Sequence, residues 1–224
     1  MTDRTVEFQE PVTFLGGGRA DSGLLRTILK RAPRLIAVDG GANMAVSEGL
    51  SPDLVIGDFD SVTEETLAAI PLDRQMRIAE QETTDFEKCL LRVRAPLILG
   101  LGFTGARVDH SLSVMSAMVR HSGKPCIILD ETDLIFAAPP RLALDLAAGT
   151  RLSLFPMATI EGRSSGLRWP IDGLTLAPDG RIGTSNEATG PVDLAFARTG
   201  MLIVLPAGQL TQAITGLLSA HGLR

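Results

Sequence analysis

The sequence predicts an α/β fold in which a doubly wound parallel sheet is followed by an all-β domain. Over the first 130 residues, short runs of β-branched residues and leucine alternate with segments of helical spacing. From about Leu134 onward, short alternating strands are separated by proline and glycine instead. We place the boundary near Pro139, so the predicted domains are residues 1–138 and 139–224.

Apolar runs in the first half are typical of buried strands and stand at residues 12–15, 35–38, 54–56, 76–78, 97–99 and 127–129. The segments between them predict helices near residues 22–31, 42–48, 62–70, 84–94 and 110–121. Continuous apolar strands that alternate with helices indicate a parallel sheet covered on both faces, because parallel strands need crossover connections. The first domain is therefore expected to be Rossmann-like.

The second half carries shorter patterns that predict strands at residues 151–155, 192–196 and 201–205. Apolar and polar residues alternate in them, which favours antiparallel strands with one buried face. We therefore expect a β-sandwich in this half. The apolar stretch 210–218 fits either a strand or a short helix, and the sequence leaves that choice open.

The composition is that of a globular protein and excludes several classes. The chain has 224 residues, of which 45% are apolar and 21% are charged. Its 21 basic and 26 acidic side chains leave a net charge of −5, which argues against nucleic acid as a partner. No stretch approaches the roughly 18 apolar residues of a membrane helix, and no apolar leader follows Met1. Cys89 and Cys126 stand in apolar surroundings typical of free thiols, so we expect a cytoplasmic protein.

Acidic residues follow four consecutive strands of the predicted parallel sheet. The residues that stand shortly after these strand ends are Asp39, Asp58, Asp60, Asp85 and Asp109. In open α/β sheets, ligands bind outside the carboxyl ends of the strands. The candidate site is therefore expected at this edge of the sheet.

Asp58 and Asp60 are separated by one residue, so both carboxylates point to the same side of an extended segment. Gly57 leaves room beside them. Ionised carboxylates that converge repel each other unless a cation lies among them, and oxygen ligands favour Mg²⁺, which commonly bridges substrate phosphates. The alternative is that either residue only caps the helix expected near Val62.

Thr84 and Asp85 open a predicted helix, so they are also a candidate N-cap with an acid in the first turn. A helix N-terminus at this sheet edge also favours a bound phosphate, so the two interpretations are compatible. Arg107 stands in a glycine-flanked loop and can pair bidentately with phosphate, or it is a solvated surface arginine. His110 follows Asp109 at a helix start, where capping or packing is the alternative role.

The run Gly16–Gly18 after the first strand starts like a dinucleotide-binding fingerprint, but Asp21 stands where the third glycine belongs. No phosphate-binding P-loop motif occurs either. The loop lies against a ligand or is only a tight turn.

Four segments, taken in order, resemble the motif set of the thiamine pyrophosphokinase (thiamine diphosphokinase) family: Asp39–Asn43, Gly57–Ser61, Thr84–Lys88 and Gly105–His110. Two further segments, Gly166–Pro170 and Thr184–Glu187, resemble the thiamine-side motifs of that family's β-sandwich domain. One departure is Ala106, where the family often has a second glycine. Any one motif is weak, but the ordered set is specific.

The resemblance implies an ATP-dependent pyrophosphotransferase. It would transfer a pyrophosphoryl group from ATP to the hydroxyl of thiamine, giving thiamine diphosphate and AMP, in a homodimer with sites at the subunit interface. The implied Mg²⁺ and phosphate cluster comprises Asp58, Asp60, Asp85 and Asp109. Around the nucleotide the resemblance implies Asp39, Asn43, Gln81, Thr84 and Arg107, with His110 kept as a further candidate there.

On the thiamine side, the resemblance implies Trp169, Ser185 and Asn186. An aromatic face attracts the cationic thiazolium of thiamine, and Trp169 is the only tryptophan in the chain. The alternative for Trp169 is a core position in the β domain.

Two other functions compete with this interpretation. A pyrophosphokinase that acts on a different alcohol, such as a hydroxymethylpterin, would share the acidic strand ends, but the thiamine-side motifs argue against it. A non-catalytic nucleotide- or thiamine-sensing module would be marked by the loss of a metal carboxylate, and none of the four aspartates of the cluster is lost.

Overall fold

The apolar runs of the first half form parallel strands in the computed structural model, which describes residues 4–223. These strands are β2 (Val12–Leu15), β3 (Arg34–Val38), β4 (Leu54–Gly57), β5 (Gln75–Arg77) and β7 (Ile98–Leu101). They pair in the order β7-β2-β3-β4-β5. Every residue of β2, β4 and β7 is buried, which explains why these segments read as unbroken apolar runs.

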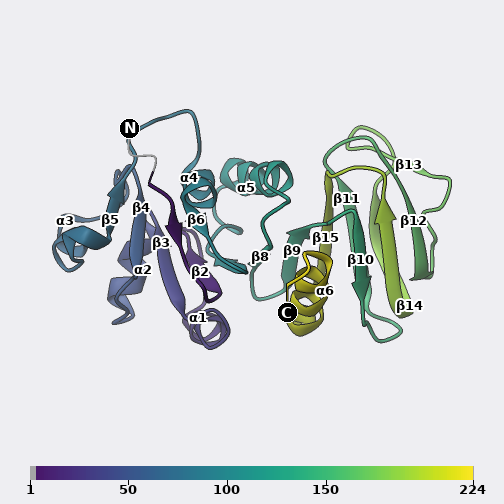
Figure 1. The fold of residues 1–224 in the computed structure, drawn as a ribbon, viewed down its shortest axis with the longest axis horizontal. Coiled ribbons are helices and arrows are strands. Elements are labelled where there is room, and N and C mark those ends of the chain that lie inside the picture. Colours follow the sequence, from purple (N-terminus) through teal and green to yellow (C-terminus); the bar gives the residue numbers. More distant parts are fainter. Residues whose placement is uncertain (1–3, 224) are drawn as a thin grey trace. The chain divides into compact units, whose positions relative to one another are not determined.

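A helix follows each of the parallel strands in the chain (Figure 1). They are α1 (Ser22–Leu29), α2 (Gly41–Ser47), α3 (Glu64–Ala68), α4 (Asp85–Arg92) and α5 (Val108–Arg120), with a 3₁₀ turn at Leu72–Arg74. Helix α2 packs on β2 and β3, whereas α4 packs on β3 and β4. Two short strands, β1 (Val6–Glu7) and β6 (Val93–Arg94), form a separate parallel pair.

Aromatic packing fixes α4 against the sheet. The Phe86 ring of α4 lies edge-on to Phe14 of β2, with ring centroids 6.3 Å apart, and to Phe103, which follows β7, at 4.9 Å. All three rings are buried. Because Phe86 is in the first turn of α4, this packing places the N-terminus of α4 at the carboxyl ends of the strands.

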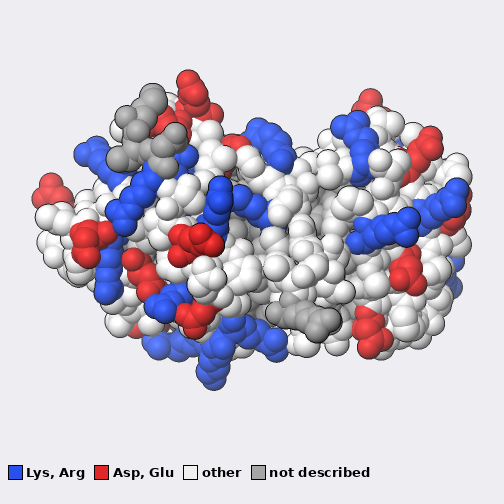
Figure 2. Space-filling model, in the orientation of Figure 1, with Lys and Arg blue, Asp and Glu red and all other residues white. Residues whose placement is uncertain are grey.

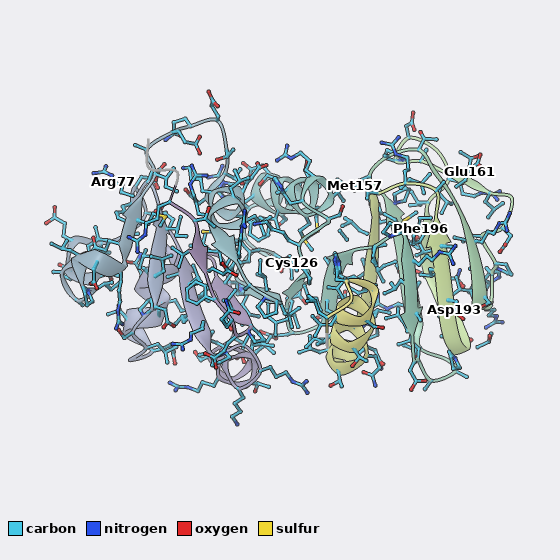
Figure 3. All side chains as sticks on the ribbon, viewed as in Figure 1. Arg77, Cys126, Met157, Glu161, Asp193 and Phe196 are labelled. Atoms are coloured by element: carbon cyan, nitrogen blue, oxygen red, sulfur yellow. The ribbon has the colours of Figure 1, made fainter. Side chains whose placement is uncertain are left out.

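The second half consists mainly of antiparallel strands. They are β8 (Cys126–Leu129), β9 (Asp133–Ala137), β10 (Arg141–Leu144), β11 (Arg151–Pro156), β12 (Ile160–Leu167), β13 (Thr175–Leu176), β14 (Gly183–Phe196) and β15 (Met201–Pro206). They pair in the order β13-β12-β14-β11-β15-β9-β8, and β10 also pairs with β14. Along β14, Asp193 is exposed and Phe196 is buried, both labelled in Figure 3, as expected for strands with one buried face.

Residues 210–218, for which the sequence allowed either a strand or a short helix, form a helix. A 3₁₀ turn at Ala207–Gln209 leads into α6 (Leu210–Ala220), which packs on β10. Its buried residues Ala213, Gly216 and Leu217 recur at helical spacing. The prediction that the second half is all-β is therefore wrong at this helix.

The chain divides into two compact units, one ending at Ala117 and the other beginning at Met118. This division precedes the predicted boundary near Pro139. The reason lies in β8, which pairs antiparallel with β9, and β9 pairs in turn with β15. The division of function between residues 1–138 and 139–224 stays a prediction.

Charged side chains of both signs are interspersed over the face of the protein shown in Figure 2. This distribution agrees with the small net negative charge. Among residues 4–223, no helix combines the length and the apolar character that crossing a membrane requires.

Candidate functional site

A cleft of about 660 Å³ lies at the carboxyl ends of the parallel strands in the first unit. Its lining includes most of the residues that the sequence singled out in this half: Asp39, Asn43, Asp58, Asp60, Gln81, Thr84, Asp85, Arg107 and His110. Of the candidate residues in the described part of this half, only Asp109 is absent from the lining. The strand-end rule thus brings nearly all of them to one place.

Two glycine loops meet at the wall of this cleft. Gly18 N donates to Gly102 O at 2.9 Å, and a Cβ on Gly16 or Gly18 would lie only 2.6 Å from that oxygen. The glycines therefore allow two backbones to approach closely. Gly16–Gly18 also lines the cleft, and its contact with a ligand stays a prediction.

Three carboxylates converge in the cleft. One oxygen from each of Asp39, Asp58 and Asp60 lies within 4.8 Å of the other two. Asp39 is buried, Asp58 is partly buried and Asp60 is exposed, so the cluster reaches solvent through Asp60. Hard oxygen ligands at this spacing suit Mg²⁺, so the donor set fits a divalent cation.

Asp39 is held in an unusual backbone conformation directly after β3. Its φ of 46° lies in the left-handed region, and its Oδ1 accepts a hydrogen bond from Phe59 N at 2.9 Å. Gly57 lies against it, because a Cβ at this position would be 2.7 Å from Asp39 Cβ. Burial raises the pKa of Asp39, and neighbouring carboxylates raise it further.

Asp39→Asn is expected to stabilise the fold near neutral pH, because Asn still accepts from Phe59 N but buries no charge. The folded state holds the Asp39 proton more tightly than the unfolded chain does. Ionised Asp39 therefore opposes folding at neutral pH, and this cost vanishes below the unfolded pKa of about 3.9. We expect the melting midpoint to rise by about 2 to 4 °C at pH 7 and the gain to shrink toward pH 4. A gain that is independent of pH would contradict this explanation.

Asp58 is more acidic than usual although burial opposes its ionisation. Asp60 N donates to Asp58 Oδ1 at 3.1 Å, and Gln81 Nε2 donates to Asp58 Oδ2 at 3.0 Å. Lys88 Nζ lies 3.8 Å from the same Oδ2. These donors and the Lys88 charge outweigh the desolvation and lower the pKa of Asp58. Gln81, expected near the nucleotide, thus also supports a carboxylate of the acidic cluster.

Lys88 is a candidate that the sequence interpretation missed. Its side chain is 3% exposed, and its Nζ lies 2.9 Å from Asp85 Oδ1. Burial alone would lower the pKa of Lys88, but the carboxylates of Asp85 and Asp58 outweigh it and raise the pKa. The available signal was its spacing, three residues after Asp85 on one face of α4. Asp85 is therefore linked to Asp58 through Lys88.

Helix capping accounts for Thr84 but not for Asp58 or Asp60. The N-caps of α4 and α3 are Thr84 and Thr63, whose side chains accept hydrogen bonds from the first turn. Asn43 Oδ1 in turn accepts from Thr63 N at 3.0 Å, so Asn43 anchors the loop that carries Asp60. Thr84 is thus a cap that also lines the cleft.

Arg107 and Asp109 form an exposed bidentate pair. Arg107 Nε lies 3.2 Å from Asp109 Oδ1, and Arg107 Nη2 lies 2.6 Å from Asp109 Oδ2, with side chains 67% and 65% exposed. The Arg107 guanidinium lowers the pKa of Asp109. Arg107 would therefore have to exchange this carboxylate for a phosphate in order to bind one. His110 lines the cleft in the first turn of α5.

The candidates of the second unit lie on strand β14 and just after its neighbour β12. Trp169 follows β12 and is 53% exposed, which excludes the core alternative. Ser185 and Asn186 lie near the start of β14, where Ser185 is exposed and Asn186 is buried. Asn186 Nδ2 donates to Trp169 O at 2.7 Å, so two of these residues are in direct contact.

Both cysteines are buried free thiols, as predicted. Burial raises the pKa of Cys126 to about 12 and raises that of Cys89 as well. Both thiols are therefore protonated at neutral pH and poor nucleophiles.

Sequence comparisons identify relatives of this chain. Residues 25–129 match the family model described as "Thiamin pyrophosphokinase, catalytic domain". A protein of Oryza sativa subsp. japonica named Thiamine pyrophosphokinase 1 is 28% identical over 194 residues, which cover 70% of this chain and 72% of that protein. Thiamin pyrophosphokinase 1 of Caenorhabditis elegans is 27% identical over 194 residues, covering 78% of this chain and 79% of that protein.

Solved structures share the fold. The thiamin pyrophosphokinase of Geobacillus thermodenitrificans superposes with a TM-score of 0.72 at 23% identity, over 87% of this chain and 96% of that chain. The yeast thiamin pyrophosphokinase superposes with a TM-score of 0.71 at 15% identity, over 96% of this chain and 93% of that chain. At these identities the likeness is one of fold.

Proposed function

We infer that this chain belongs to the thiamine pyrophosphokinase family, and that it transfers a pyrophosphoryl group from ATP to thiamine and releases thiamine diphosphate and AMP. The observation that carries the inference is the cleft in which Asp39, Asp58 and Asp60 converge. This cleft lies largely within the matched residues 25–129. The carboxylates would repel the triphosphate of ATP unless a cation were bound between them. A cluster that can bind a divalent cation therefore fits a nucleotide site.

The reaction requires positioning and charge neutralisation. The thiamine hydroxyl oxygen attacks the β-phosphorus of ATP, the bond from that phosphorus to the oxygen bridging to the α-phosphorus breaks, and AMP leaves with that oxygen. The hydroxyl proton is released. A transition state of this kind spreads negative charge over the phosphoryl oxygens, so fixed positive charges and alignment supply most of the catalysis.

We propose that Asp39, Asp58 and Asp60 hold Mg²⁺, with Asp85 and Asp109 as the further carboxylates that the family resemblance implies. When bound, the ion would neutralise charge on the phosphate oxygens. Lys88 and Arg107 would add positive charge on the cleft lining. Asn43, Gln81, Thr84 and His110 would surround the nucleotide.

We further propose that residues 1–138 form the Rossmann-like nucleotide domain and that 139–224 form a β-sandwich that binds thiamine and dimerises. The first domain also carries an apolar surface that a second copy could bury, because Val108 and Leu112, one turn apart on α5, are 75% and 61% exposed. The two buried free thiols support a reducing, cytoplasmic location.

Incubation with ATP, Mg²⁺ and thiamine, followed by chromatography, tests the activity directly. We expect AMP and thiamine diphosphate in equal amounts. AMP formation with a hydroxymethylpterin in place of thiamine would favour the other pyrophosphokinase. Binding of thiamine and ATP without any AMP release would favour a sensing module.

Arg107→Lys is expected to lower turnover at saturating ATP by about tenfold or more, because a lysine ammonium cannot contact two phosphate oxygens bidentately. Arg94→Lys is the matched control, since Arg94 is an exposed arginine outside the cleft lining. Turnover of Arg107→Lys equal to that of the control would make Arg107 a surface residue.

Trp169→Ala is expected to weaken thiamine binding by about 0.5 to 2 kcal/mol while leaving ATP binding nearly unchanged. Because Trp169 is 53% exposed, the free energy of unfolding should fall by much less than the roughly 3 to 5 kcal/mol that truncation of a core tryptophan costs. The melting midpoint should accordingly fall only slightly. Thiamine should also change the Trp169 emission saturably, and ATP alone should change it little. A large loss of stability with unchanged thiamine affinity would remove Trp169 from the site.

A further inference from the structure

We propose that Asn186 is a positioning residue that holds Trp169 in place, and that Arg168 covers one face of the Trp169 ring. The proposal rests on the proposed function, in which Trp169 meets thiamine. It replaces the expected direct contact of Asn186 with thiamine by an indirect role. The residues that carry it all belong to the second unit.

Asn186 uses its side chain on the backbone of Trp169. The side chain is buried, its Nδ2 donates to Trp169 O at 2.7 Å, and its Oδ1 accepts from Trp169 N at 3.2 Å. Oδ1 also accepts from Glu187 N at 2.8 Å, which uses its second lone pair. One side chain thus binds both backbone polar groups of Trp169, and its carbonyl oxygen has no acceptor capacity left for a ligand.

The backbone conformation of Ser185, near the start of β14, explains why the Asn186 side chain points inward. Ser185 has a φ of 60°, in the left-handed region, and its backbone N donates to the Oγ of buried Ser153 at 2.9 Å. Ser185 itself is exposed, whereas Asn186 is 6% exposed. Of the two neighbours, Ser185 is therefore the one that can touch a ligand.

Arg168 restricts the ring from one side. Its Cζ lies 4.9 Å from the centroid of the Trp169 ring, a distance at which a guanidinium is attracted to the aromatic face. The same side chain lies 3.5 Å from Glu187 Oε2, and Arg168 N donates to Glu187 O at 2.8 Å. With one face covered, the opposite face remains for a planar ligand.

These contacts matter because the half-exposed indole lacks the packing that would orient a core side chain. A ring held before the ligand arrives loses less conformational freedom on binding. Loss of Asn186 should therefore raise the KM for thiamine much more than it changes kcat or the KM for ATP.

The fluorescence of Trp169 allows a direct test, since the chain has one tryptophan and no tyrosine. We compare the full chain with its Asn186→Ala and Asn186→Asp variants without ligands. Asn186→Ala should lower the emission anisotropy and raise the KM for thiamine about tenfold, the factor that corresponds to one lost hydrogen bond. The anisotropy and the KM of Asn186→Asp should lie between those of the parent and of Asn186→Ala, because Asp still accepts from both backbone N–H groups but cannot donate to Trp169 O.

Ser185→Ala is the matched control, because it removes the neighbouring hydroxyl and leaves the Asn186 hydrogen bonds intact; its anisotropy without ligands should equal that of the parent. A raised KM for thiamine with unchanged anisotropy in Asn186→Ala would overturn the proposal in favour of direct contact. An unchanged KM for thiamine together with an unchanged anisotropy in Asn186→Ala would also overturn the proposal. If circular dichroism shows that Asn186→Ala does not fold, the Asp variant decides by the same criteria.

Arg168→Gln tests the covered face, and we expect acrylamide to quench Trp169 more strongly once that face is open. An unchanged quenching constant would overturn the covering role. Failure of the proposed function itself looks different: the parent would then form no thiamine diphosphate, while the anisotropy would still decide whether Asn186 holds Trp169.

Discussion

Asp58→Asn is expected to lower turnover by about two to three orders of magnitude while the protein stays folded. Asp58 combines a lowered pKa with a place in the convergent carboxylate cluster, so it is the acid best prepared to stay ionised beside a cation. An amide has almost the same size, but it cannot supply the negative charge that binds the ion. Less repulsion within the cluster and a weaker attraction to Lys88 act in opposite directions on stability, so the melting midpoint should change little.

The matched control is Asp73→Asn, which makes the same chemical change at an exposed position outside the cleft lining. Turnover should be measured at saturating ATP, thiamine and Mg²⁺, and again across a series of Mg²⁺ concentrations. A requirement for more Mg²⁺ would support a ligand role. Near-normal turnover of Asp58→Asn at every Mg²⁺ concentration would remove Asp58 from the metal set.

Removal of divalent cations by excess chelator is expected to reduce product formation at least about a thousandfold. Without a cation, the carboxylates of Asp39, Asp58 and Asp60 repel the triphosphate. The fold should persist, because the buried ammonium of Lys88 already balances Asp58 and Asp85. We therefore expect lost turnover with a nearly unchanged melting midpoint.

Addition of Mg²⁺ beyond the chelator should restore product formation, which excludes irreversible damage as the cause. The assay should follow AMP and thiamine diphosphate separately, because AMP alone can come from contaminating hydrolysis. Undiminished formation of thiamine diphosphate in excess chelator would sink the metal proposal.

The parallel strands could be predicted because burial on both faces leaves an uninterrupted signal. Residues 54–56 are all apolar, and the strand is observed at Leu54–Gly57. By contrast, β12 (Ile160–Leu167) contains serines, glycines and charged residues with few buried positions, so no apolar run marks it. Strand β8 was predicted at its observed place, but its antiparallel pairing with β9, which lies only a short turn later in the chain, was not.

The candidate site was predictable where its residues share one strand end, as Asp58 and Asp60 do. The position of Asp39 within their cluster depends on the pairing of β3 with β4, and that of Lys88 depends on the packing of α4 on β4. Such tertiary placement leaves no periodic trace in the sequence. For the same reason, the motif containing Asn186 did not reveal that its side chain binds the backbone of Trp169.

The close contact between Gly57 and Asp39 means that one added methyl group can disable the site without removing any of its residues. The Cβ of an alanine at position 57 would meet the Cβ of Asp39 at 2.7 Å and its Cα at 3.0 Å, and neither atom can rotate aside as a side-chain tip would. Asp39 would have to shift, and with it one member of the carboxylate cluster. A natural variant with this change would retain every aspartate and still lose their arrangement, so a complete set of motif acids does not by itself identify a working enzyme.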